Sequence, residues 1–139
     1  MRLLFIIAFI SISTALIAQK KGDNTVIVDK AISFSNLKTD LFMDGYMMDG
    51  SDTNFITTSA KGINGALLFK FNILRTDSSI IIKGQLKSTI DLNFGSATLK
   101  SEFEPVHYVN NPGNDYRKCW EEMNKLALFI GGAVKYIKQ

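Results

Sequence analysis

The sequence predicts an α+β fold in which an antiparallel sheet of four to five strands carries two helices on one face, in β-α-β-β-β-α order. Apolar and polar residues alternate along residues 67–74 and 80–87, which is the period of a strand with one buried face. In residues 33–44 and 116–137, apolar residues instead recur at spacings of three and four, the period of one helix face. Because a sheet with one apolar face needs a cover, the two amphipathic segments predict a two-layer sandwich.

Residues 1–18 have the pattern of a secretory signal peptide. Arg2 precedes an apolar run that ends in small residues, after which the polar chain begins. Cleavage after Ala18 and cleavage after Ala15 both fit this pattern, and we favour Ala18 because the residues that follow it are polar. The remaining residues, 19–139, are predicted to form a single domain in the periplasm or in the medium.

Charge and cysteine content narrow the class of protein. The chain has 16 basic and 13 acidic residues, so its net charge of +3 falls to +2 when Arg2 leaves with the signal peptide. This small excess is spread along the chain and gives no case for a nucleic-acid partner. Cys119 is the single cysteine, so packing alone has to stabilise the domain.

The apolar run 126–134 is about half as long as a bilayer-spanning helix, and we expect no transmembrane segment in the mature chain.

The first half of the mature chain predicts a strand, a helix and a second strand. Residues 25–28 form a β-branched run that is typical of a strand. Ser33 is a suitable N-cap for the helix that follows, and Gly45 is placed to end that helix in the left-handed conformation. Residues 55–58 again have the composition of a strand.

The alternating segments 67–74 and 80–87 are separated by a short polar turn, so they predict an antiparallel hairpin with one buried face. Residues 90–94 continue the apolar alternation, and they either prolong the second strand or begin another. We expect one more short edge segment within residues 99–106, followed by irregular chain rich in Asn, Pro and Gly.

Residues 116–137 predict the longest helix, with Asn114 or Asp115 as its N-cap. Gly131 and Gly132 oppose this prediction, because two glycines in a helix interior cost about 2 kcal/mol relative to two alanines. The pair either lets another backbone approach closely or bends the helix. We favour close packing on the sheet, because the apolar stripe continues in phase to the end of the segment.

A further pattern of residues extends over nearly all of the mature chain. Its members are Ile32-Ser33-Phe34, Leu41, Gly45-Tyr46, Asp52, Ile56-Thr57-Thr58, residues 80–84, Trp120-Glu121-Glu122-Met123, Ala127 and Tyr136. This pattern resembles small exported bacterial proteins of unknown function, whose domains are similar to one half of the TATA-binding-protein fold or to envelope-assembly lipoprotein modules. The resemblance implies a helix-covered antiparallel sheet and a non-enzymatic role without a named ligand. The lipidation cysteine of the lipoprotein modules is missing here.

The residues that could carry chemistry are few, and we expect no enzyme. His107, the single histidine, is interpreted as a loop residue, and a thiol centre that pairs it with Cys119 is the weaker hypothesis. A thiol near a helix start can have a lowered pKa, but its place beside Trp120 favours a small buried side chain. The acidic turn 49–52 lacks the spacing of an EF-hand, and no glycine-rich phosphate loop follows a strand. We therefore expect no metal and no cofactor.

These observations predict an exported, non-enzymatic binding or structural domain that contacts another cell-envelope protein through an exposed sheet face or an edge strand. The alternative is a carrier that holds an apolar small molecule between sheet and helices, in a cavity lined by Phe69, Phe71, Ile82 and Trp120. The candidate contacts with a partner or ligand are Tyr46, Met47, Met48, Leu68, Ile81 and Trp120. For the methionines, filling of the core is the competing interpretation.

Overall fold

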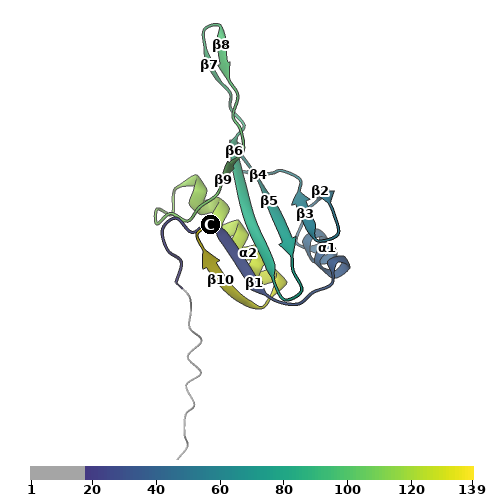
Figure 1. The fold of residues 1–139 in the computed structure, drawn as a ribbon. Coiled ribbons are helices and arrows are strands. Elements are labelled where there is room, and N and C mark those ends of the chain that lie inside the picture. Colours follow the sequence, from purple (N-terminus) through teal and green to yellow (C-terminus); the bar gives the residue numbers. More distant parts are fainter. Residues whose placement is uncertain (1–17) are drawn as a thin grey trace, which may run out of the picture.

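In the computed structural model, which describes residues 18–139, an antiparallel sheet carries two helices and a projecting hairpin (Figure 1). The predicted signal peptide, residues 1–18, lies outside the described residues except for Ala18. The elements are β1 (Thr25–Asp29), α1 (Phe34–Met43), β2 (Met48–Ser51), β3 (Phe55–Thr58), β4 (Lys61–Ile63), β5 (Leu67–Arg75), β6 (Ile80–Ser88), β7 (Leu92–Phe94), β8 (Ala97–Leu99), β9 (Glu104–Pro105), α2 (Asp115–Ile130) and β10 (Ala133–Ile137). The predicted α+β class is confirmed.

The main sheet of the described chain has eight strands, so the prediction of four to five strands was wrong. Six strands follow the order β10-β1-β6-β5-β3-β2, while β4 pairs with β5 and β9 pairs with β6. Every one of these pairings is antiparallel. The strands β2, β4, β9 and β10 have 4, 3, 2 and 5 residues. Segments this short do not show the alternation that marks β5 and β6 in the sequence.

The C-terminal segment differs most from the prediction. The helix α2 ends at Ile130, and residues 133–137 form the strand β10, so the chain ends on a strand rather than on a helix. Gly131 and Gly132 have φ angles of 77° and 127°, which a right-handed helix does not contain. The strand β10 pairs with β1 along its full length. The apolar residues in 133–137 fit the period of a helix and also that of a strand. The pairing with β1 determines that they form a strand.

The glycine pair also explains why β10 can come so close to β1. A Cβ built on Gly132 would lie 2.7 Å from the carbonyl oxygen of Asp29. Close approach of another backbone was one of the two interpretations of the pair, and it holds for Gly132. The approach occurs at the entry of a strand, however, and not inside a helix.

Both helices begin where the sequence predicts. The Ser33 hydroxyl accepts a hydrogen bond from the backbone N–H of Asn36 (3.1 Å), and the Asn114 side chain accepts one from the N–H of Tyr116 (2.9 Å). Gly45, at φ 84°, follows the end of α1 as expected. Within residues 18–139, neither helix is both long and apolar enough to span a bilayer.

The alternation in β5 and β6 places one side of each strand against the helices. Phe69, Phe71 and Ile73 of β5 are buried on this side, together with Ile80 and Ile82 of β6. In Figure 1, α2 lies behind β1 and β6, and it contacts β1, β5 and β6. The buried apolar residues of the core are Val26, Val28, Leu37, Leu41, Tyr46, Ile56, Phe69, Phe71, Ile73, Ile80, Ile82, Leu86, Val106, Cys119, Trp120, Met123, Leu126, Ala127 and Ile130.

Beyond β6 the chain leaves the body of the fold as a hairpin, here called the arm and defined as residues 89–103 (Figure 1). Its outer end is the two-stranded sheet of β7 and β8, in which Leu92 lies opposite Leu99. The turn consists of Gly95 and Ser96, and the φ of 61° at Gly95 is the positive value that a type II′ turn has at its first central position. Of the two alternatives for residues 90–94, the separate strand is therefore the correct one.

Candidate functional site

In the described part of the chain, one side of the main sheet is not covered by a helix. We call this side the open face. It consists of the residues that alternate with buried neighbours along β1, β3, β5 and β6, so the strand period that builds the core also builds this surface. Its members are Ile27, Asp29, Phe55, Thr57, Leu68, Lys70, Asn72, Leu74, Ile81, Lys83, Gln85 and Lys87.

An apolar row crosses the open face from strand to strand. Ile27 of β1 lies opposite Ile81 of β6. Ile81 lies opposite Leu74 of β5, which in turn lies opposite Phe55 of β3. Leu74 and Phe55 are 41% and 42% exposed, while Ile27 and Ile81 are half-buried. Directly opposed side chains on one face of a sheet are close enough to contact each other, so the four residues form a continuous apolar strip.

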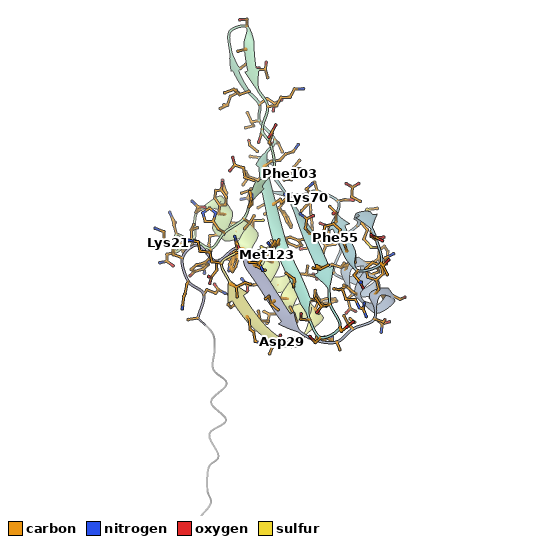
Figure 2. All side chains as sticks on the ribbon, in the orientation of Figure 1. Lys21, Asp29, Phe55, Lys70, Phe103 and Met123 are labelled. Atoms are coloured by element: carbon orange, nitrogen blue, oxygen red, sulfur yellow. The ribbon has the colours of Figure 1, made fainter. Side chains whose placement is uncertain are left out.

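Lysines border this row on the side toward the arm. Lys70 lies opposite Gln85, which places it diagonally between Lys83 and Lys87 on the neighbouring strand. The ammonium groups of Lys70 and Lys87 lie 4.3 and 5.0 Å from the centre of the Phe103 ring, and Figure 2 shows Lys70 and Phe103 near the base of the arm. Along β1, β3, β5 and β6 the open face has one acidic residue, Asp29, which lies at the end of β1 away from the arm and forms an ion pair with Lys135. It therefore combines an apolar strip with a positively charged end.

Four of the six candidate contact residues lie where a partner can reach them. Leu68 and Ile81 belong to the open face and are half-buried. Met47 and Met48 are 71% and 37% exposed, and they lie directly before and at the start of the edge strand β2. These methionines do not fill the core, so they remain candidates for contact at the edge of the sheet.

The other two candidate contact residues, Tyr46 and Trp120, lie in the core. Tyr46 packs against Phe69 and Phe71, with ring centres 6.3 and 5.2 Å apart, and burial together with the charge of Glu122 raises the pKa of its hydroxyl. Trp120 is fully buried, so neither side chain is part of a surface that a protein partner contacts.

Three residues of the apolar row, Ile27, Phe55 and Leu74, were not among the predicted contacts. Each alternates with buried neighbours, as Ile81 does, so the strand period contains the signal that they share one face. The sequence does not contain the register between strands that are distant along the chain. It is the register that aligns these residues into one row.

The four side chains that were expected to line a ligand cavity are packed in the core. Phe69, Phe71, Ile82 and Trp120 are each at most 1% exposed, and the two phenylalanine rings are 5.2 Å apart. The indole N–H of Trp120 is buried and has no hydrogen-bond partner among the described residues.

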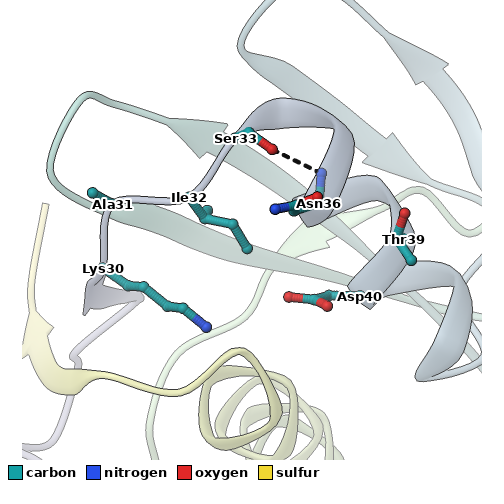
Figure 3. A pocket seen from close by; sticks show the side chains of 7 residues that line it. All are labelled: Lys30, Ala31, Ile32, Ser33, Asn36, Thr39 and Asp40. Atoms are coloured by element: carbon teal, nitrogen blue, oxygen red, sulfur yellow. Dashed lines mark hydrogen bonds between the residues drawn. The ribbon is translucent and has the colours of Figure 1, made fainter.

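A shallow pocket of about 390 Å³ opens beside the start of α1 (Figure 3). Lys30 and Asp40 face it from opposite sides. Two of its polar groups already have structural partners, because the Lys30 ammonium donates to the carbonyl oxygen of Ile130 at the end of α2, and the Ser33 hydroxyl caps α1. The lining residues are Lys30, Ala31, Ile32, Ser33, Asn36, Thr39 and Asp40.

The thiol of Cys119 is not placed to act as a nucleophile. It is fully buried, and burial, with a further contribution from the charge of Glu122, raises its pKa to about 12. Desolvation therefore outweighs the lowering that a helix start can give. The His107 ring stacks on Tyr116, with ring centres 4.5 Å apart. Among residues 18–139, no three His, Cys, Asp or Glu side chains are grouped so that they could hold a metal ion.

The chain matches no protein-family model, no curated protein and no solved structure. The resemblance to small exported bacterial proteins with a TATA-binding-protein-like or envelope-lipoprotein-like domain therefore stays a prediction.

Proposed function

We propose that this chain is an exported, non-enzymatic binding domain that contacts another cell-envelope protein through the open face of its sheet. The observation that carries the proposal is the apolar row of Ile27, Ile81, Leu74 and Phe55, which crosses four strands on a side without a covering helix. Solvent-exposed apolar strips with polar borders are typical of protein contact sites.

The charge of the open face indicates the chemistry of the partner. Lys70, Lys83 and Lys87 border the apolar row without an acidic residue among them. A partner surface with an apolar centre and acidic residues at one end complements this arrangement. The burial of Cys119 and its raised pKa support the non-enzymatic part of the proposal.

The proposal is tested by capture from an envelope extract of the source cells. The mature chain, residues 19–139, is immobilised, and captured proteins are identified by mass spectrometry. Leu74→Glu places a negative charge in the apolar row at a side chain that is 41% exposed, so the domain itself should stay folded. We expect this variant to lower the affinity for the captured protein by about tenfold or more, because it puts a charge into an apolar contact.

Leu128→Glu is the matched control. Leu128 is 74% exposed on α2, which packs on the other side of the sheet, so the same substitution adds the same charge far from the open face. We expect the control to capture the same protein as the unmodified chain. Capture that is equally strong with Leu74→Glu contradicts the proposed surface, and the absence of any specific partner contradicts the proposed function.

The carrier of an apolar small molecule remains the alternative. It is favoured by one observation, the buried indole N–H of Trp120 without a partner among the described residues. A ligand with a hydrogen-bond acceptor would satisfy this group. Native mass spectrometry of the purified mature chain tests the alternative, since a carrier retains a bound molecule and a domain that binds only proteins does not.

A further inference from the structure

The pocket beside the start of α1 is built by two segments of the chain that the fold holds in place (Figure 3). Lys30 directly follows β1, which is paired on both sides in the main sheet. Asn36 and Asp40 lie four positions apart on α1, so they share one face of the helix. The Ser33 hydroxyl caps this helix. The polar groups of the pocket are therefore presented by the end of a central strand and by a capped helix.

Two opposite charges face each other across this pocket without touching. Figure 3 shows the Lys30 ammonium and the Asp40 carboxylate pointing toward each other, but the two are not among the ion pairs that the described residues form. Asp29, the neighbour of Lys30 in the sequence, is already paired with Lys135. Both Lys30 and Asp40 are half-buried, so solvent screens their charges less than it screens fully exposed ones. A ligand that contacts both groups gains from both charges.

The charged groups of the pocket keep hydrogen-bonding capacity for a ligand. The Lys30 ammonium donates one of its N–H groups to the carbonyl oxygen of Ile130, which holds the ammonium in position and leaves its other donors available. The Asp40 carboxylate and the Asn36 side-chain amide make no hydrogen bond to any other residue that the structure describes. The pocket thus offers donors at one side, acceptors at the other, and an amide that can do either.

We infer that this pocket binds a small zwitterion, a free amino acid or a dipeptide, in one orientation. The carboxylate of the ligand accepts hydrogen bonds from the Lys30 ammonium, and the ammonium group of the ligand donates to the Asp40 carboxylate. The pocket volume of about 390 Å³ lies in the range of small-molecule sites, roughly 300–1,000 Å³. Ile32, which also lines the pocket, offers a contact for an apolar side chain of the ligand.

The lining disfavours other classes of small ligand. An anion such as phosphate is repelled by Asp40, and a cation such as a polyamine is repelled by Lys30. An apolar ligand would take water away from both charges without giving either a partner. The pocket lies beside α1 and the end of α2 rather than on the open face, so this inference does not rest on the proposed function.

The inference is tested by NMR titration of the isotope-labelled mature chain with L-leucine and with L-alanyl-L-alanine. We expect saturable shifts of the backbone amide signals of residues 30–40, with a dissociation constant of about 1 mM or below for at least one of the two probes. The probe that binds more tightly shows whether the ligand is an amino acid or a dipeptide. Its N-acetylated form lacks the ammonium group and its amidated form lacks the carboxylate, so each should bind about tenfold more weakly or worse.

Asp40→Asn removes the negative charge of the pocket and keeps the shape of the side chain. It should weaken binding of the zwitterionic probe by about tenfold or more and leave the N-acetylated form unaffected. Asp49→Asn is the matched control, because Asp49 is exposed in β2 and the same charge is removed outside the pocket, so binding should change by less than about threefold. Amide signals outside the pocket verify that both variants are folded. The inference is overturned if no saturable shifts occur around the pocket, if the blocked probes bind as tightly as the zwitterion, or if Asp40→Asn changes binding no more than Asp49→Asn does.

Discussion

Replacing Gly132 by alanine is expected to destabilise the domain, because two costs act at this position. The φ of 127° is a conformation that residues with a Cβ rarely adopt, and such strain costs about 1–3 kcal/mol. The new Cβ would also lie 2.7 Å from the carbonyl oxygen of Asp29, which cannot move without disturbing the pairing of β1 with β10. Overpacking of this kind adds about 1–3 kcal/mol. The expected loss is therefore about 2–6 kcal/mol.

Substitutions at two further glycines distinguish the cost of backbone strain from the cost of overpacking. At Gly131 the φ is 77°, but the nearest atom to a built Cβ is the Lys30 ammonium nitrogen at 3.9 Å, so Gly131→Ala should lose only the strain, about 1–3 kcal/mol. At Gly50 a Cβ meets no atom within 4 Å and φ is not positive, so Gly50→Ala should leave stability unchanged or raise it by about 0.4–1 kcal/mol.

Urea unfolding of the mature chain measures all three variants, with the fluorescence of the buried Trp120 as the signal. With a slope of about 1–3 kcal/mol per molar urea, a loss of about 3 kcal/mol lowers the midpoint by about 1–3 M. The sign of the change is decisive. If the helix continued through Gly131 and Gly132, each alanine would stabilise the chain by about 1 kcal/mol. Stabilisation by both substitutions would therefore refute the strand β10.

Four other expectations follow from the packing of the core and from the N-cap of α1. Cys119 should react with a thiol reagent near pH 8 only after unfolding, because burial raises its pKa to about 12. In the unfolded chain the thiol loses its proton at lower pH than in the folded domain, so the free energy of unfolding should fall above about pH 9 by up to about 1.4 kcal/mol per pH unit. Cys119→Ala should remove the contribution of the thiol to this decrease, which the urea midpoint measures. Ser33→Ala should cost about 1 kcal/mol, measured in the same way, because α1 loses its N-cap. Gly84→Val should lower stability by about 2 kcal/mol or more, because even a Cβ would lie 2.8 Å from the Met123 sulfur. When Met123→Ala is also present, the valine should destabilise the domain less, and a double-mutant cycle measures this difference.

The parts of the fold that the sequence predicts correctly are those with a local physical cause. The β5–β6 hairpin follows from the alternation along these two strands, in which buried residues alternate with more exposed ones over residues 68–74 and 80–87. The start of α1 follows from Ser33, whose hydroxyl caps the helix. The end of α2 was placed too late, because residues 133–137 satisfy the helical and the strand pattern equally. Pairing with β1, more than 100 residues away, selects the strand, and no local pattern contains that information.

For the candidate site, too, the local patterns are predictable from the sequence and the long-range pairing of strands is not. The sequence indicates that Leu68 and Ile81 alternate with buried residues, and both lie on the open face. It does not indicate that Leu74 and Phe55 continue a row from Ile81, because this depends on the order and register of β3, β5 and β6. Trp120 is one of the predicted contacts, but the structure places its large side chain in the core.

The strand β1 lies between β6 and β10, so folding has to bring together segments that are far apart along the chain. Asn24 exchanges two hydrogen bonds with Gln139, 115 positions away (2.8 and 3.0 Å). Contacts between such distant segments require the closure of a very long loop, so they form late, whereas β5 and β6 can associate early. A growing polypeptide thus keeps one edge of β1 unpaired until β10 has been synthesised and is free to pair with it. The pairing of β10 with β1, rather than the earlier pairing of β5 with β6, therefore completes this edge of the main sheet.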